Sequence, residues 1–312
     1  MTKESIFSRS RFEYEGDHLY YLEDSKVHLL ENHTAIVIHG SRGTGKTTLL
    51  NALNWKEQLS NRSLQESVGP KKYTNQYLGV YLKLPKINIG SFSKWQSSDE
   101  IIYAQLFALY LDLVWLEQLA IAIGTLASTN EIVISAKEER SICNEIHKYC
   151  RSLFESLGCS RNVFGLMDLR DIFKTLRESL EQAATYGEDA IDLHRNLNLV
   201  GQVGEYGREI SKILHGLWSS KGNSDYAFKI CMDECECLDD FQIKVLSTLV
   251  RIGSSPVFFV LSFISFPRDF YSTLVPNLSL GKPYVSSISL YEMKYSEFQK
   301  FAECVFLVRL RA

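Results

Sequence analysis

Residues 40–47 read Gly-Ser-Arg-Gly-Thr-Gly-Lys-Thr, which matches the pattern G-x-x-x-x-G-K-[ST] without a mismatch. In this pattern the glycines let the backbone wrap around an anion and aim its N–H groups inward. We expect Lys46 to reach the β and γ phosphates of a nucleotide and the Thr47 hydroxyl to bind Mg²⁺. The pattern therefore predicts a phosphate-binding loop, with nucleotide contacts from Gly40, Ser41, Arg42, Gly43, Thr44, Gly45, Lys46, Thr47 and Thr48.

Asp233 and Glu234 form a second group that could do chemistry. They follow the apolar run Ile-Cys-Met at 230–232, which is typical of a buried strand. An Asp at the carboxyl end of such a strand can hold Mg²⁺ through the water shell of the metal. A following Glu can act as the general base that polarises a water for attack on the γ-phosphate. The alternative is an acidic pair that opens a solvated loop.

The next apolar run, residues 256–263, carries Ser262 near its carboxyl end, and Ser265 lies just beyond. A polar side chain at this place can contact the attacking water or the γ-phosphate. We assign this role first to Ser262 and second to Ser265. The expected catalytic residues are thus Glu234, Lys46 and Ser262. Further acids follow the Asp-Glu pair, and we expect them to cap a helix or to face solvent: Glu236, Asp239 and Asp240.

The sequence around these motifs predicts the elements that position them. Residues 34–39 are apolar and β-branched, as in a buried parallel strand, and residues 48–55 have apolar residues at helical spacing. A strand, a glycine loop and a helix in this order are what phosphate binding needs. Further strands are expected at 77–84, 226–234, 256–263 and 284–290, and helices at 239–252 and from about 295.

This alternation predicts an α/β P-loop NTPase fold, a mostly parallel sheet with helices on both faces. Helical spacing alone fills the region between the second and third strands, which predicts a large helical insertion. We therefore divide the chain into an ATPase core at 1–85 and 225–312 and a mainly helical insertion at 86–224. Within the insertion we expect helices at 98–127, 131–157, 165–186 and 189–219. The glycine-rich run 201–207 has the wrong spacing for a dinucleotide loop and is expected to be a helix junction.

The composition is that of an ordinary soluble globular protein, with 45% hydrophobic and 23% charged residues. A net charge of −3 gives no basic surface over the whole chain, although a local patch is compatible with it. The first residues lack the apolar core of a signal peptide, and seven cysteines fit reduced cytosolic thiols better than a disulfide framework. We expect a cytoplasmic protein.

The apolar segment 104–127 is long enough to span a bilayer, but Asp112 and Glu117 lie near its middle. Each acid costs about 2.5–3.5 kcal/mol at the centre of an inserted helix. We therefore expect no membrane span, and a helix buried in a helical domain or in a subunit interface instead.

Cysteines offer one further constellation, because Cys143, His147 and Cys150 share a face of a predicted helix, with Cys159 just beyond. Such ligands could hold Zn²⁺, but buried cysteines are common, so a core role is favoured. The same holds for the cysteines around the acidic pair, Cys231, Cys235 and Cys237.

Taken together, the phosphate loop, the run Met-Asp-Glu-Cys-Glu-Cys-Leu and the strand Phe-Val-Leu-Ser resemble AAA+/STAND-type ATPases. Within these they resemble the branch similar to the origin-recognition initiator ATPases, which bacteria also carry in stand-alone and defence-associated forms. The resemblance covers roughly 1–85 and 225–312. It implies ATP, Mg²⁺, self-assembly into a homo-oligomer, and often a DNA or protein partner.

Two departures from this family pattern stand out. The helical insertion lies where such proteins usually have one helix. The sequence also ends before a helical lid could form, which puts a sensor arginine on the lid in doubt and leaves open that the sequence is a fragment. Arg268, in the loop after the serine strand, could serve as an arginine finger or be a plain surface arginine.

Other P-loop classes are disfavoured by missing motifs. A GTPase needs Asn-Lys-x-Asp, which is absent, and the run Leu-Ser-Leu-Gly at 278–281 is not the Leu-Ser-Gly-Gly signature of ABC and SMC-like ATPases. Small-molecule kinases usually lack the Asp-Glu pair. The sequence predicts a Mg²⁺-dependent ATPase that acts as a molecular switch or motor, with the insertion as its partner or oligomerisation surface. The alternative is a nucleotide-gated binding or scaffold module with negligible turnover.

Overall fold

The structure, a computed structural model, describes a set of ranges that covers most of the chain: residues 30, 33–59, 77–84, 87–95, 99–156, 163–199, 202–219, 221–222, 225–253, 255–267, 270, 272–274 and 285–290. The described residues form a five-stranded sheet in the order β2-β3-β4-β1-β5, and each pair of neighbours is parallel. This confirms the predicted α/β class. The predicted strands differ from the observed ones only at their ends: β1 (Ala35–His39), β2 (Tyr77–Lys83), β3 (Ala227–Asp233), β4 (Val257–Phe263) and β5 (Val285–Ser289).

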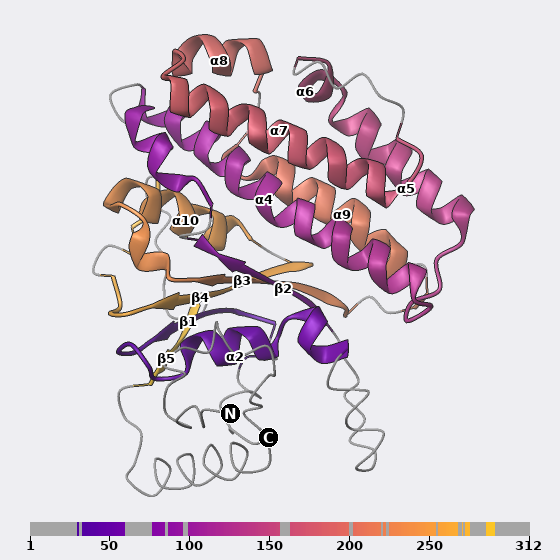
Figure 1. The fold of residues 1–312 in the computed structure, drawn as a ribbon, viewed down its shortest axis with the longest axis horizontal. Coiled ribbons are helices and arrows are strands. Elements are labelled where there is room, and N and C mark those ends of the chain that lie inside the picture. The colour runs from indigo at the N-terminus through magenta and orange to yellow at the C-terminus, as the bar shows by residue number, and fades with distance from the viewer. Residues whose placement is uncertain are drawn as a thin grey trace, which may run out of the picture.

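Helices cover both faces of the sheet (Figure 1). The helix α2 (Lys46–Ala52), which follows the phosphate loop, packs on one face, and α10 (Asp240–Ile252) packs on the other. Side chains alternate along each strand, so that Ile36 and Ile38 of β1 pack with α2 while Val37 packs with the opposite layer. Burial on both faces explains why these strands read as nearly continuous apolar runs.

Between β2 and β3 the described residues form helices, as predicted, and these lie on the α10 face of the sheet (Figure 1). Two of the expected helices are each broken in two. The helix expected at 131–157 is interrupted at Cys150, and the one expected at 189–219 ends first at Asn198, whose left-handed backbone (φ 48°, ψ 45°) cannot continue a helix. The observed elements are η3 (Ile89–Trp95), α4 (Glu100–Ser128), α5 (Ala136–Tyr149), α6 (Arg151–Ser156), α7 (Leu166–Tyr186), α8 (Ala190–Leu197) and α9 (Glu205–Ser219).

The junction expected at the glycine-rich run lies between α8 and α9. Gly204 has φ +75° directly before α9, and Gly207 lies in the first turn of that helix. The boundaries of core and insertion remain predictions, because one continuous cluster of buried side chains runs from the sheet through α10 into the helices between β2 and β3.

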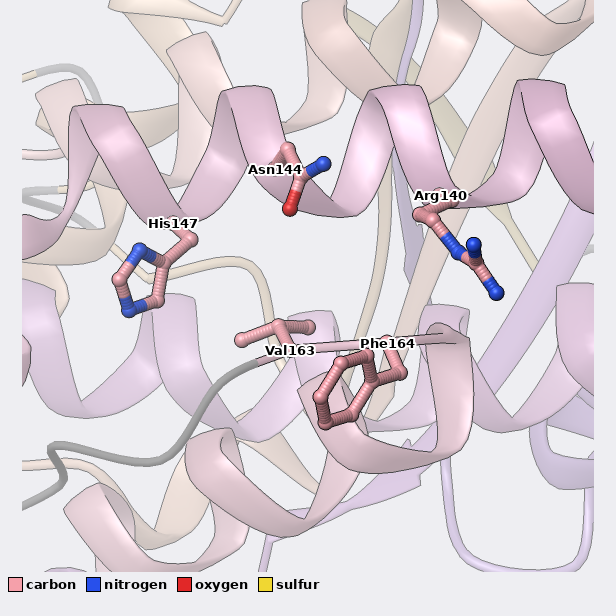
Figure 2. Close-up of a pocket in the computed structure, with 5 residues that line it drawn as sticks. All are labelled: Arg140, Asn144, His147, Val163 and Phe164. Carbon is pink, nitrogen blue, oxygen red and sulfur yellow. The ribbon is translucent and has the colours of Figure 1, made fainter.

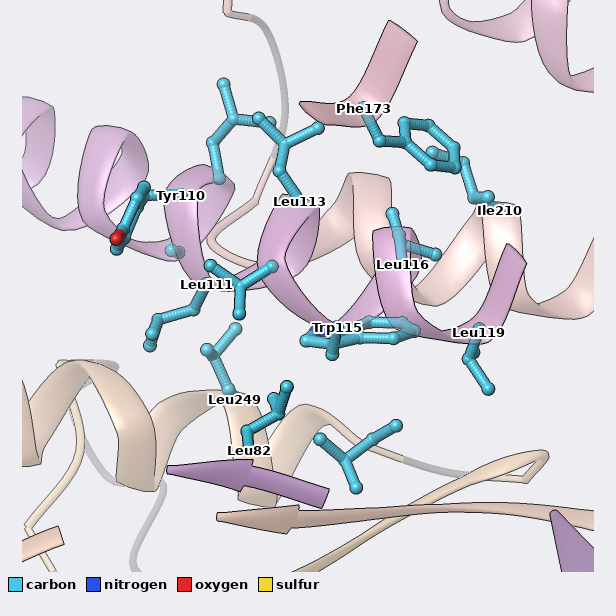
Figure 3. Close-up of a cluster of buried hydrophobic side chains, with 14 of the residues drawn as sticks. Leu82, Tyr110, Leu111, Leu113, Trp115, Leu116, Leu119, Phe173, Ile210 and Leu249 are labelled. Atoms are coloured by element: carbon cyan, nitrogen blue, oxygen red, sulfur yellow. The ribbon is translucent and has the colours of Figure 1, made fainter. Parts of the chain in front are cut away.

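The centre of that cluster is α4, which is long and apolar enough to cross a membrane but has 89% of its apolar window buried inside the protein. Figure 3 shows how its neighbours surround it. Trp115 of α4 points toward Leu249 of α10 and Leu82 of β2, while Phe173 of α7 and Ile210 of α9 approach from other sides. A helix that is apolar all round is expected to be buried in this way.

The two acids in the middle of α4, Asp112 and Glu117, have partners inside the protein. Asp112 is 2% exposed, and its carboxylate accepts a hydrogen bond from the Gly207 N–H in the first turn of α9 (2.9 Å). Any Cβ at Gly207 would lie 2.4 Å from that carboxylate, so glycine is required by the close approach. Glu117 accepts a hydrogen bond from the Arg177 guanidinium of α7 (2.9 Å), which also binds Glu181 (2.7 Å). The acids thus tie α4 to α9 and α7.

The buried carboxyl of Asp112 predicts a pH-dependent stability. Burial raises its pKa from 3.8 to about 7, so the folded protein keeps this proton over a pH range in which the unfolded chain has released it. This contribution to the free energy of unfolding is complete below about pH 4 and is lost as the pH rises to about 7. Asp112→Asn, which stays neutral, should flatten the decline in urea-unfolding measurements between about pH 4 and about pH 7.

The control is Asp192→Asn, which changes an exposed acid of α8 and should keep the slope of the wild-type protein. An Asp112→Asn protein that loses stability with pH as steeply as the wild type would contradict the assignment.

Candidate nucleotide-binding site

The phosphate loop joins β1 to α2, and its glycines are required for two different reasons. Gly43 and Gly45 have φ values of +82° and +89°, a left-handed backbone that side chains rarely adopt. Gly40 instead lies in a close contact, because a Cβ there would be 2.7 Å from the Thr44 hydroxyl and 2.9 Å from Leu290. The loop is therefore held by local backbone geometry and by packing against the residue that follows β5.

Lys46 begins α2 and is 9% exposed. Its ammonium donates hydrogen bonds to the carbonyl oxygens of Gly40 (2.5 Å) and Ser41 (2.9 Å), so the side chain lies back along its own loop. Burial lowers the pKa of Lys46, and the negative charges of three acids oppose that effect: Glu236, Asp233 and Glu234. The lysine charge is thus close enough to the acidic strand end to be stabilised by it.

Asp233 ends β3 and is 1% exposed. Its carboxylate receives four hydrogen bonds. Oδ2 accepts from the Thr47 hydroxyl (2.7 Å) and from the Tyr81 hydroxyl of β2 (2.8 Å). Oδ1 accepts from the Ser262 hydroxyl and from the Glu234 N–H (3.0 Å). The two predicted Mg²⁺ ligands, Thr47 and Asp233, therefore lie in direct contact.

Glu234 has a left-handed backbone (φ 58°, ψ 43°), which is uncommon for a residue other than glycine and costs free energy. Its N–H donates to the Ser262 hydroxyl (3.0 Å) as well as to Asp233. Its carboxylate pairs with the Lys83 ammonium at the end of β2 (3.1 Å). The expected base is thus held by an ion pair that the sequence motifs did not indicate.

Tyr81 and Lys83 are the residues that sequence reasoning missed. They lie two positions apart on β2, and the strand register places Lys83 beside Asp233. Their types alone carry no signal, since a tyrosine and a lysine in an edge strand are ordinary. Only the pairing of β2 with β3 brings them to the acids.

Ser262, the first choice for a catalytic serine, is fully buried between the two acids, donating to Asp233 and accepting from Glu234. This geometry makes it a positioning residue for both, whereas Ser265 is exposed. Asp239 caps α10 as predicted, accepting from the Gln242 N–H (2.9 Å). Three further predictions lie outside the described residues: Arg268 as arginine finger, Cys159 beside the cysteine helix, and the helix from about 295.

The cysteine constellation of α5 has a different environment from a metal site. Cys143 and Cys150 are fully buried, and burial raises the pKa of the Cys143 thiol to about 12, which disfavours the thiolate that zinc needs. His147 instead lines a surface cavity of about 250 Å³ between α5 and the segment before α7 (Figure 2). Among the described residues no group of three or more His, Cys, Asp or Glu is arranged to hold a metal.

The phosphate loop and the acidic strand end fit a nucleotide with Mg²⁺. Hydroxyl and carboxylate oxygens are the ligands that Mg²⁺ takes in proteins, and Thr47 and Asp233 supply one of each. A Cβ at Gly43 or Gly45 would meet no atom within 4 Å, so the backbone of the loop is open where a phosphate is expected.

Comparison with known families agrees with this geometry. A family model described as ORC-CDC6-like matches residues 17–312. The chain belongs to the ORC-CDC6-like family. No curated protein and no solved structure matches the chain. Membership of the ORC-CDC6-like family confirms the resemblance to origin-recognition initiator ATPases and is consistent with a P-loop ATPase fold.

The two hydrogen bonds of Ser262 predict that its removal lowers the free energy of unfolding. Ser262→Ala removes a donor from the buried Asp233 carboxylate and an acceptor from the Glu234 N–H, which should cost about 1–3 kcal/mol of unfolding free energy. Urea unfolding measures the loss. Ser265→Ala, at an exposed site, is the control and should change stability by less than about 0.5 kcal/mol. Equal effects of the two changes would refute the bridging role of Ser262.

Proposed function

We propose that the protein is a Mg²⁺-dependent ATPase that works as a molecular switch or motor. The observation that carries the proposal is the 2.7 Å contact between Thr47 and Asp233, which are 186 positions apart in the sequence. It joins the phosphate loop to the acidic strand end at the carboxyl edge of a parallel sheet, where ligands bind in such folds. Membership of the ORC-CDC6-like family supports the coarser assignment to ATPases.

Each residue of the site has a role in this proposal. The loop N–H groups and Lys46 bind the β and γ phosphates, with Lys46 leaving the carbonyls of its own loop. Thr47 and Asp233 would hold Mg²⁺, and the metal, when bound, would neutralise phosphate charge. Glu234 takes a proton from a water whose oxygen forms the new bond to the γ-phosphorus, while the bond to the β-γ bridging oxygen breaks and releases ADP and orthophosphate.

The ion pair between Lys83 and Glu234 favours a second candidate function, a nucleotide-gated binding module with negligible turnover. The ion pair holds the Glu234 carboxylate on the Lys83 ammonium at 3.1 Å, which restrains it from turning toward an attacking water. In such a module the same loop binds nucleotide, and the bound state rather than hydrolysis controls a partner.

Either function needs a route from the site to a partner surface, and the described contacts supply one. The chain runs from Glu234 through η4 (Cys235–Cys237) into α10. Gln242 of α10 donates to the Tyr103 hydroxyl of α4 (3.2 Å), and Phe241 stacks on the Tyr103 ring at 5.1 Å. We therefore assign the helices between β2 and β3 to partner binding or self-assembly, with DNA or protein as the partner. The cytoplasm is the proposed location, where the free cysteines of the described residues remain reduced.

Two substitutions test the proposed ATPase. Lys46→Ala should abolish binding of a fluorescent ATP analogue, because the loop loses the ammonium expected to bind the β and γ phosphates, and Lys137→Ala on α5 is the matched control. Glu234→Gln should keep ATP binding but lower steady-state hydrolysis by about 100-fold or more.

Glu236→Gln, two residues further on and exposed, is the control for the base. Loss of turnover in Glu236→Gln with normal turnover in Glu234→Gln would move the base assignment to Glu236, whose charge also acts on Lys46.

Lys83→Met separates the two candidate functions. If Glu234 is a base restrained by the ion pair, removing the ammonium should raise kcat by up to about 5-fold, since a partly exposed pair is worth up to about 1 kcal/mol. The same change at the exposed Lys137 should leave kcat unchanged. Tight ATP binding with no phosphate release in either protein, with or without DNA, would favour the binding module.

A further inference from the structure

We propose that the Tyr81 hydroxyl, which donates a hydrogen bond to the Asp233 carboxylate, competes for that carboxylate with the water molecules bound to Mg²⁺. This inference rests on the proposed function, because it assigns a new residue to the same site. Tyr81 belongs to β2 and donates to Asp233 Oδ2 at 2.8 Å. It would thereby set the Mg²⁺ concentration at which the site is loaded.

The first step is the number of hydrogen bonds that the Asp233 carboxylate can accept. An ionised carboxylate offers about four lone-pair sites, two on each oxygen. Asp233 already receives two hydrogen bonds at Oδ1 and two at Oδ2 from protein groups. A metal-bound water that donates to this carboxylate must therefore displace one of the four donors.

The second step identifies the donor that can leave. The Glu234 N–H is a backbone group fixed by the turn after β3, and Ser262 is fully buried on β4. The Thr47 hydroxyl can keep its proton on Asp233 while its own oxygen lone pair binds a metal. Tyr81 is a half-buried side-chain donor on β2, at the edge of the sheet order, and unlike the half-buried Thr47 it is not an expected metal ligand. It also shares Oδ2 with the predicted metal ligand Thr47.

The third step gives the sign of the effect. Removing the Tyr81 hydroxyl destabilises the metal-free arrangement, in which the phenol serves Asp233, and leaves the metal-bound arrangement unaffected. Tyr81→Phe should therefore tighten Mg²⁺ binding. A residue that helped to hold the metal would give the opposite sign.

The experiment is a Mg²⁺ titration of a fluorescent ADP analogue bound to the full chain, in wild type and in Tyr81→Phe. The midpoint in Mg²⁺ should fall by about 3- to 10-fold in Tyr81→Phe, as expected for losing one hydrogen bond to a charged group in the competing state. Thermal unfolding with the nucleotide gives a second measure, because the rise in Tm from EDTA to Mg²⁺ should be larger in the variant.

Tyr77→Phe is the matched control, since it removes a hydroxyl from the same strand. The Tyr77 oxygen accepts a hydrogen bond from Gln58 (2.9 Å), and Asp233 makes no hydrogen bond to it in the described structure. Its midpoint should equal that of the wild type.

An unchanged or higher midpoint in Tyr81→Phe, with a wild-type protein that binds nucleotide in a Mg²⁺-dependent way, would overturn this inference and leave the proposed function standing. Nucleotide binding by the wild type that does not respond to Mg²⁺ at all would overturn both.

Discussion

The site depends on one buried negative charge. Asp233 is 1% exposed, and a carboxylate so placed is tolerated only where hydrogen bonds replace the water it has lost. Four donors do so, from the phosphate loop, from β2, from β4 and from the turn after β3. The sheet order explains how they can all reach it, because β3 lies between β2 and β4, and β1 follows on the far side of β4. The hydrogen bond from Thr47 therefore does two things at once: it helps to stabilise the buried Asp233 carboxylate, and it holds the phosphate loop beside the acids.

The helices between β2 and β3 bury the apolar helix α4, and they do so away from the buried Asp233 carboxylate. The apolar helix α4 has apolar side chains all round, and these pack against α7, α9, α10 and the face of the sheet on which α10 lies. The two acids in its middle, Asp112 and Glu117, are met by Gly207 of α9 and Arg177 of α7, so these acidic side chains also hold its neighbours in place. The helix α2, which follows the phosphate loop, packs against the opposite face. The large insertion can thus be accommodated while the nucleotide edge keeps its geometry.

Local patterns predicted the parts of the fold that depend on local physics. The phosphate loop, the apolar strands and the long helix α4 each follow from glycine geometry or hydrophobic spacing, and the contact of Thr47 with Asp233 follows from the parallel sheet. The break at Cys150 was missed, because apolar spacing continues through it while the backbone does not, whereas the glycine-rich run 201–207 did indicate the junction between α8 and α9. Tyr81 and Lys83 were missed for another reason: the pairing of β2 with β3 across a long insertion decides which side chains of β2 meet the acids, and no local pattern encodes that pairing.

That same strand links the chemistry to the insertion. Tyr81 binds the expected metal carboxylate and Lys83 binds the expected base, so both acids of β3 are held by side chains of β2. From Lys83 the chain continues toward η3, where Ser93 hydrogen-bonds to Asp239, the residue that caps α10. The segment that follows β2 therefore contacts the start of α10, the helix that follows the acids of β3. The partners of Asp233 and Glu234 lie on β2 and in the turn before α10, and α10 contacts Tyr103 of α4 through Gln242 and Phe241. These contacts form a direct path from the nucleotide site to the helices between β2 and β3.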